Sequence, residues 1–179
     1  MEAVSIHEAR TLALDDDLCA APAGRVVVIG CGNPLRGDDA FGPNLVQHLW
    51  TRGVPEGVVL VDGGTAGMDV AFKMRDAEHV VIVDAAMTGA APGTVFCVPG
   101  GELEDLPAID GLHTHQFRWD HALAFGRWLL AEHYPQRVTV YLVETADTTH
   151  GAPLSEPVLG VLEQVAGLVR AHYPEATGG

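Results

Sequence analysis

The fold is decided by the segment RVVVIGCGNPLRGDDAFG, which spans residues 25–42. It begins with a run of β-branched residues, passes through a glycine-rich loop and enters a segment with helical spacing. Phe41, Leu45, Val46 and Leu49 form one apolar stripe of a helix expected over residues 39–52. A strand, a short loop and a helix in this order are typical of layered α/β domains.

Further apolar runs continue this alternation along the chain. We expect five strands, over residues 25–32, 57–64, 78–86, 93–100 and 137–145. Four of them have the continuous apolar character of strands buried on both faces. The run at 93–100 is short and close to its predecessor, so we expect it to pair antiparallel at or near an edge. With further helices over 67–76, 116–134 and 156–173, the pattern predicts a three-layer αβα sandwich around a mostly parallel, about five-stranded twisted sheet.

Two local signals refine the helices. Ser155 is the expected N-cap of the last helix, and Pro157 is compatible with its first turn. In the long helix over 116–134, Trp119 and Trp128 are expected to face the core.

The composition describes an acidic globular protein of one domain. The chain has 179 residues, with 10 Lys and Arg against 24 Asp and Glu, for a net charge of −14. Such a field repels a phosphate backbone, so we expect no nucleic-acid partner. No apolar run approaches the roughly 20 residues that span a bilayer, so we expect no membrane partner. We assign an acidic N-terminal tail to residues 1–24, a single α/β domain to 25–173 and a C-terminal tail to 174–179.

Cysteine usage indicates a reducing compartment. The three cysteines, Cys19, Cys31 and Cys97, are far apart and form no C-x-x-C motif. The first 24 residues also lack the basic start and apolar run of a secretory signal. We therefore expect a cytoplasmic protein.

Carboxylates follow two of the predicted parallel strands. Asp62 and Asp84 end the runs VVLVD and VVIVD. Ligands of open α/β sheets bind in the crevice at the carboxyl ends of the strands, so we expect both side chains to face one crevice. Either residue alone is equally understood as a turn former.

The loop after the first strand resembles a dinucleotide-binding loop only in part. Leu35 occupies the position of the third glycine of G-x-G-x-x-G, and Asp38 and Asp39 stand where a pyrophosphate would dock. One of the two carboxylates can cap the helix while the other projects over the strand ends. A carboxylate above a crevice that already holds Asp84 requires a compensating cation, which favours a metal site.

Histidine supplies the third kind of ligand. His113 and His115 lie in the loop that enters the long helix, and either can complete the set. Imidazole with carboxylates suits nickel, zinc or cadmium. The spacing contains no H-E-x-x-H pair, so a surface position remains an alternative for these side chains.

In combination, these motifs resemble the maturation endopeptidases of nickel–iron hydrogenases. The resemblance runs colinearly from about residue 25 to 167. Its motifs are Gly30-x-Gly32-Asn33-x-Leu35-x-x-Asp38-Asp39-x-x-Gly42, Asp62-Gly63-Gly64-Thr65-Ala66-Gly67, Asp84-Ala85, Pro92-Gly93-Thr94 and His115-Gln116.

The resemblance implies a cytoplasmic protease of the aspartic type that trims the large-subunit precursor of a hydrogenase once nickel is inserted. It places Asp39 and Asp84 as catalytic residues and Asp39, Asp84 and His115 as nickel ligands. The nickel would come with the substrate, and cadmium or zinc would substitute for it. The residues expected to contact the substrate are Gly32, Asn33, Asp38, Asp62, Gly63, Gly64 and Thr65.

Two other functions fit the same residues. A non-catalytic, nickel-dependent chaperone of the large subunit would use the same ligand set without cutting. A nucleotide-binding, Rossmann-like protein would bind NAD or FAD. A cysteine protease is disfavoured, because Cys31 has no clear activating base and is understood as a small residue packed under a turn.

Overall fold

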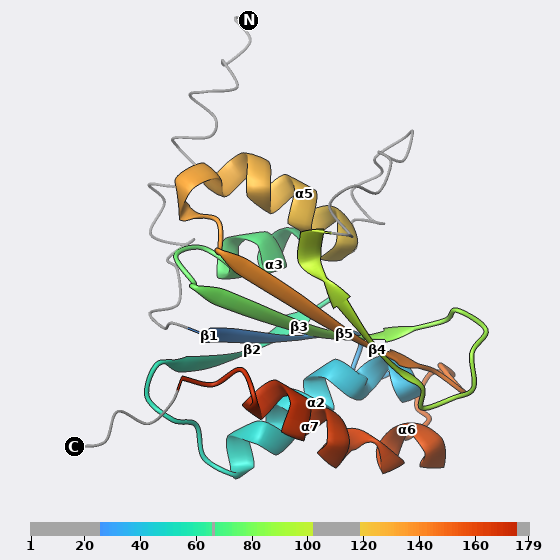
Figure 1. Cartoon of the computed structure of the whole chain (residues 1–179). Helices are drawn as coiled ribbons and strands as arrows, with labels where there is room; N and C mark the ends of the chain where they lie inside the picture. The colour runs from blue at the N-terminus through green and yellow to red at the C-terminus, as the bar shows by residue number, and fades with distance from the viewer. Residues whose placement is uncertain (1–25, 66, 102–118, 175–179) are drawn as a thin grey trace, which may run out of the picture.

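The computed structural model describes residues 26–65, 67–101 and 119–174. Five strands form one sheet in the order β2-β1-β3-β5-β4, drawn in Figure 1. The first four in this order run parallel, and β4 pairs antiparallel with β5 at the edge, as predicted. The strands are β1 Val26–Cys31, β2 Val58–Gly64, β3 His79–Ala86, β4 Val95–Pro99 and β5 Arg137–Glu144.

Helices cover both faces of the sheet, so the three-layer sandwich is confirmed (Figure 1). One face carries α2, α6 and α7, and the other carries α3 and α5. The bounds are α2 Phe41–Thr51, α3 Gly67–Lys73, α5 Trp119–Leu130, α6 Glu156–Gly160 and α7 Leu162–Arg170, with short 3-10 turns η2 Gly37–Ala40 and η4 Ala131–His133. Within the three described ranges, no helix is both long enough and apolar enough to cross a membrane.

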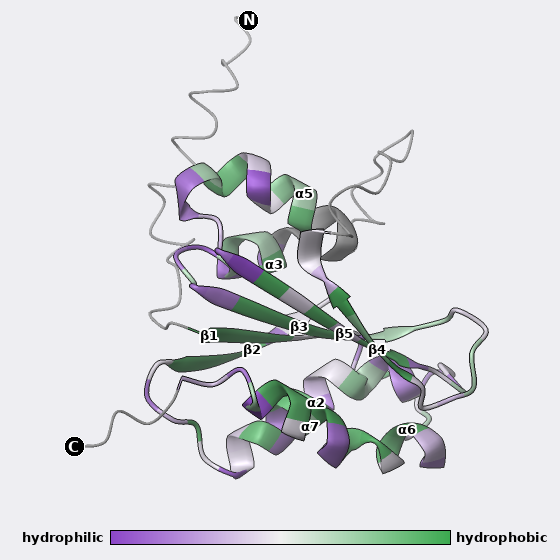
Figure 2. Cartoon of the chain, viewed as in Figure 1, coloured by the Kyte–Doolittle hydropathy of each residue, from purple (hydrophilic) through white to green (hydrophobic). Residues whose placement is uncertain are grey.

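A hydrophobic core lies on each face of the sheet, between the strands and the helices that cover that face. Alternate residues of β1 contribute to each, because successive side chains of a strand point to opposite faces. Val27 and Ile29 pack with Met74 and Leu123 toward α3 and α5. Val26 and Val28 belong to the second core, toward α2 and α7. Figure 2 shows the consequence, with apolar strands between helices that are apolar on one side only.

Three expectations from sequence were wrong in detail. β2 is not buried on both faces: it lies at an edge of the sheet, and its central residues are only half-buried. The single helix expected over 156–173 is interrupted at Val161, directly after Gly160, a residue that weakens a helix. The third concerns Trp128, which is 46% exposed rather than buried in the core.

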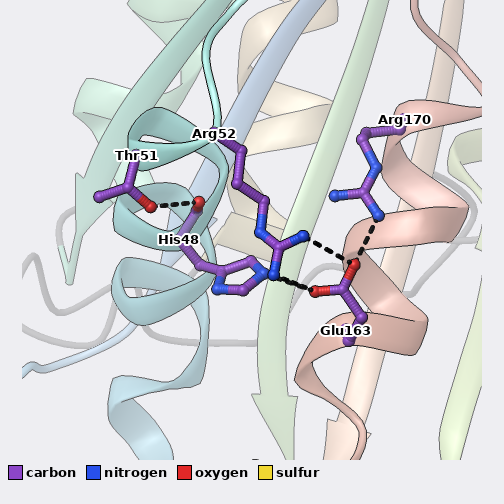
Figure 3. A network of polar contacts seen from close by, with 5 residues as sticks. All are labelled: His48, Thr51, Arg52, Glu163 and Arg170. Atoms are coloured by element: carbon purple, nitrogen blue, oxygen red, sulfur yellow. Dashed lines mark hydrogen bonds and ion pairs between the residues drawn. The ribbon is translucent and has the colours of Figure 1, made fainter.

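Glu163 ties the two helices of one face together. Its carboxylate accepts hydrogen bonds from His48 at 2.8 Å and Arg170 at 2.8 Å, and it pairs with Arg52 at 3.0 Å (Figure 3). The bond from Arg170, followed by that from His48, lowers the pKa of Glu163. The group is exposed, so we regard it as fixing the register of α2 against α7 more than as a source of stability.

A buried histidine lies at the amino end of the sheet. His79 begins β3 and is 1% exposed, with Nε2 3.0 Å from Thr139 Oγ1. Its ring lies edge-on to that of His172, with 4.7 Å between centroids. Burial, and secondarily the charges of Arg137 and His172, lowers the pKa of His79 to about 4. The imidazole is therefore neutral at pH 7.

We predict that this histidine makes the fold acid-sensitive. The unfolded chain binds the proton at a higher pH than the folded chain, so the stability contributed by neutral His79 is lost as pH falls from 6.5 toward about 4. Chemical unfolding at pH 7 and pH 4 should show His79→Gln losing less stability than the wild type, by up to about 3 kcal/mol. Equal losses in both proteins would contradict this assignment.

Candidate active site

The point where strand order reverses lies between β1 and β3. The chain passes from β1 to β2 on one side of β1, and then to β3 on the other side. The loops that follow β1 and β3 therefore leave the sheet next to each other, which is where open α/β sheets bind ligands. The first of these loops leads through η2 into α2.

Glycines let α2 approach the sheet at this point. A Cβ on Gly42 would collide with the backbone of Cys31 and would lie 2.7 Å from the carbonyl oxygen of Val83. A Cβ on Gly30 would meet the backbone of Gly42 and lie 2.7 Å from a methyl group of Val46. The start of α2 thus rests directly on the ends of β1 and β3, and any side chain at either position would push it away.

Asp39 and Asp84 meet around Gly32. Gly32 has a φ of 126°, and its Cα faces the backbone carbonyl of Asp39. A Cβ there would lie 3.6 Å from Asp84 Oδ1. The backbone of Asp39 and the carboxylate of Asp84 therefore both lie close to Gly32.

The two aspartates differ in environment. Asp39 is half-buried; its Oδ2 accepts a hydrogen bond from the Asn33 backbone at 3.2 Å, whereas Oδ1 accepts none from a described residue. Asp84 is 7% exposed, and its Oδ1 accepts from the Ala85 backbone at 2.8 Å. Asp84 was expected at a strand tip. β3 continues past it to Ala86, where the predicted strand over 78–86 also ended, because β5 pairs with β3 that far, whereas β1 pairs only to Val83.

Asp38 is completely buried and points away from this pair. Its carboxylate accepts hydrogen bonds from the backbones of Ala146 (2.7 Å), Asp147 (2.9 Å) and Ser155 (2.7 Å), and from Ser155 Oγ (2.9 Å). Burial alone would raise the pKa of Asp38, but these hydrogen bonds outweigh it and the pKa is lowered. Asp38 therefore holds the loop 146–155, which fits an orienting role rather than the contact with substrate expected from the resemblance.

Neither capping expectation was met. No side chain caps η2 or α2, so Asp38 and Asp39 do not act there as caps. Ser155 does occupy the N-cap position of α6, but its hydroxyl donates to Asp38 instead of accepting from the helix. The hydrogen bond between Ser155 and Asp38 therefore takes the place of the helix caps that the sequence predicted for these residues.

Glu144 is a third buried carboxylate at this end of the sheet, after Asp38 and Asp84, and the sequence reading missed it. It is 3% exposed and ends β5. Its oxygens accept from the Thr88 backbone (2.9 Å), Thr88 Oγ1 (2.8 Å) and the Gly89 backbone (2.8 Å). The bond from the Thr88 backbone is the main reason that the pKa of Glu144 is lowered. The run YLVE, residues 141–144, ends in a carboxylate as VVLVD and VVIVD do, and this was the available signal.

The last residues of β2 lie beside the end of β1, with Asp62 opposite Gly30 and Gly64 opposite Cys31. Asp62 is exposed, and its Oδ1 accepts from the Gly64 backbone at 2.9 Å, which is the turn-forming role considered above. Gly63 is buried, and a Cβ on it would lie 3.1 Å from Cys31 Sγ. Gly64 has a φ of 56°, and Thr65 is exposed.

Cys31 lies between the acidic groups as a packing residue. It is 2% exposed. Burial, followed by the charges of Asp84 and Asp62, raises the pKa of its thiol well above the usual range. A thiol that resists ionisation is a poor nucleophile, so the interpretation of Cys31 as a buried small residue is confirmed.

Two loops join to form the rim. The Gly151 backbone donates to the Leu35 carbonyl at 2.8 Å, and Arg36 Nε donates to the Thr148 carbonyl at 3.3 Å. Leu35 is 61% exposed, and Met87, after β3, is 80% exposed. The rim thus presents apolar side chains on the loops that Asp38 and Glu144 hold.

The histidine of the predicted site lies outside the described residues. His113 and His115 both fall in 102–118. Among the residues that the structure describes, no three His, Cys, Asp or Glu side chains gather in a metal-binding group. The described donors are therefore Asp39, with one oxygen open, and Asp84.

Comparison with known proteins places these features in one family. A family model described as hydrogenase maturation protease matches residues 43–172, a segment that contains Asp84 and His115 and begins after Asp39. The Hydrogenase 2 maturation protease of Escherichia coli (strain K12) is 32% identical over 160 residues, covering 85% of this chain and 94% of that protein. The hydrogenase expression/formation protein HupM of Azotobacter chroococcum mcd 1 is 31% identical over 152 residues, covering 84% and 72%.

Solved structures agree. The hydrogenase maturating endopeptidase HybD from E. coli superposes with a TM-score of 0.71 at 30% identity, covering 82% of this chain and 90% of that one. A maturation protease HycI from Thermococcus kodakarensis shares the fold, with a TM-score of 0.63 at 22% identity and coverage of 82% and 90%.

We predict that Asp38→Ala destabilises the protein by about 3 kcal/mol, since it leaves buried backbone donors without an acceptor. The neighbouring Asp39→Ala serves as control and should cost less than about 1 kcal/mol, because its side chain accepts one hydrogen bond from the described residues, at 3.2 Å. Urea unfolding measures both. Comparable losses for the two variants would count against the role of Asp38.

We further predict that Glu144→Gln loosens the loop after β3. In the wild type, the backbone N–H groups of Thr88 and Gly89 donate to the Glu144 carboxylate. In the variant they would face the NH2 group of the glutamine, so both backbone amides should exchange with solvent faster. Hydrogen exchange followed by NMR measures this, with the exposed Glu156→Gln as control. Unchanged protection at both amides would show that the loop does not depend on Glu144.

Proposed function

Because the chain belongs to the hydrogenase maturation protease family and is a hydrolase, we propose that it removes the C-terminal extension of a nickel–iron hydrogenase large-subunit precursor after nickel insertion. The observation that supports this most is the meeting of Asp39 and Asp84 around Gly32 at the switch point of the sheet. Nickel in this proposal is part of the substrate.

The donor chemistry supports recognition of nickel. Oδ1 of Asp39 accepts no hydrogen bond from a described residue, and both Asp39 and Asp84 lie close to Gly32. With the imidazole of His115, these carboxylates would form the mixed oxygen and nitrogen set that suits nickel, zinc or cadmium. Recognition of nickel would make cleavage conditional on its insertion, because an empty precursor offers these residues no ion.

Recognition would also position the bond to be cut. An ion bound both to the precursor and to these side chains holds the neighbouring peptide at a fixed place, which lowers the entropic part of the barrier. Water then adds to the peptide carbonyl, the C–N bond breaks and the new amine takes up a proton. In this proposal the nickel, Asp39 or Asp84 activates the water.

The rim would receive the peptide around that bond. Gly32, Asn33 and the segment 62–65 would line the approach of an extended chain, which glycine backbone lets come close; of these residues, Asp62 and Thr65 are exposed. The exposed side chains of Leu35 and Met87 would contact apolar residues of the precursor. Because Asp38 and Glu144 hold the loops that carry them, the rim is formed before substrate arrives.

We predict that Asp39→Asn, Asp84→Asn and His115→Gln each slow cleavage of nickel-loaded precursor by about 100-fold or more, because each removes a proposed ligand. The control is Asp69→Asn, an exposed residue on the first turn of α3, which should cleave at the wild-type rate. Shortening of purified precursor on a denaturing gel is the measurement.

The same gel separates the alternatives. A non-catalytic chaperone would leave the precursor at full length with wild-type protein, and full activity in all three variants would refute the nickel-recognition site. Precursor without nickel should remain uncut. Calorimetry with NAD and FAD should show no binding, since a nucleotide-binding protein is the remaining alternative.

A further inference from the structure

A second cavity opens at the amino ends of the strands, at the opposite end of the sheet from Asp39 and Asp84. Its volume is about 520 Å³, and it lies between the starts of β1, β3 and β5 and the segment that follows α7. β1 connects the two ends, and its six residues, rising about 3.3 Å each, separate them by roughly 17 Å. The cavity therefore shares no residue with the candidate active site.

The lining brings three basic side chains together. His79 and Arg137 are paired neighbours at the starts of β3 and β5, and His172 follows α7. Arg137 is close enough to both histidines to affect their charge. After burial, its positive charge is the next cause that lowers the pKa of His79 and of His172. Tyr173 adds a phenol to the same wall.

Arg137 has no acidic partner within the described part of the chain. This is unusual in a protein where acids outnumber Lys and Arg by 24 to 10. The other described arginines each have a side-chain contact: Arg36 with the Thr148 carbonyl, Arg52 and Arg170 with Glu163, Arg75 with Asp76, and Arg127 with the ring of Tyr134. The guanidinium of Arg137 is exposed at the cavity.

His79 provides the independent sign of a ligand. Its Nε2 is 3.0 Å from Thr139 Oγ1, whereas its Nδ1 is buried with no hydrogen-bond partner among the described residues. A buried polar atom without a partner is rare in native structures and calls for an unplaced group. His172 Nε2 is already 2.8 Å from the hydroxyl of Tyr141, so its Nδ1 edge is the one left for the cavity.

We propose that this cavity binds a small carboxylate anion, held by the guanidinium of Arg137 with His79, His172 and Tyr173 around it. The planar fork of an arginine matches the two oxygens of a carboxylate. A metal is disfavoured, since no three ligating side chains gather there among the described residues and Arg137 would repel a cation.

The charge of the site favours a monoanion over a phosphate. Arg137 is the one formal positive charge that lines the cavity, because the two histidines have lowered pKa values, and the exposed carboxylate of Glu78 lies at the same rim. A single guanidinium balances one negative charge. A second charge on the ligand would face Glu78 without compensation.

Titration of the full chain with sodium acetate tests the proposal, with side-chain nitrogen NMR of the histidines as the readout. We expect saturable shifts at His79 and His172 at pH 7, where acetate is ionised. Sodium chloride at equal ionic strength should not produce them. Inorganic phosphate should bind more weakly than acetate.

Matched arginine variants locate the effect. Arg137→Gln should weaken acetate binding by at least about tenfold, the loss of one charge-assisted contact. Arg52→Gln removes the same charge from α2 and should bind as the wild type. Shifts that fail to saturate, that chloride reproduces or that persist in Arg137→Gln would overturn the site, and tighter binding of phosphate would overturn the carboxylate assignment. No outcome depends on protease activity, so the result is separate from the proposed function.

Discussion

The geometry of the cleft depends on one buried carboxylate. Asp38 accepts four hydrogen bonds from the segment 146–155, and these offset the cost of burying its charge. The contact joins the loop after β1 to the segment after β5. Because Asp39 follows Asp38 directly, the position of one carboxylate fixes the position of the next.

The carboxylates at this end of the sheet divide into two kinds. Asp38 and Glu144 are saturated with hydrogen bonds from loops, and both have lowered pKa values, so they remain charged and structural. Oδ1 of Asp39 accepts no hydrogen bond from a described residue, and both Asp39 and Asp84 lie close to Gly32. Acidic residues thus hold the loops of the rim, which gives part of the strongly negative composition a local structural role.

The sequence predicted the strands, and with them the end of the sheet at which Asp39 and Asp84 lie, because both depend on local information. Continuous apolar runs identify buried strands, and parallel strands bring their carboxyl ends to one edge. The same runs could not show that β2 lies at an edge, since edge position is decided by the order of strands. Nor could they show that the Ser155 hydroxyl donates to the distant Asp38 instead of accepting from its own helix. Glu144 was missed for the same reason, because its partners belong to the loop after β3.

The bonds of Asp38 also set an order of events during synthesis. Its partners lie 108 to 117 positions later in the chain. β1 and α2 leave the ribosome long before Ser155 exists, so the carboxylate must wait, solvated, until the last third of the polypeptide emerges. Closure across such a distance is a late step for any chain. A nascent or C-terminally shortened copy would therefore carry the right aspartates without a formed cleft, and the cell would be protected from a cutting enzyme that is itself unfinished.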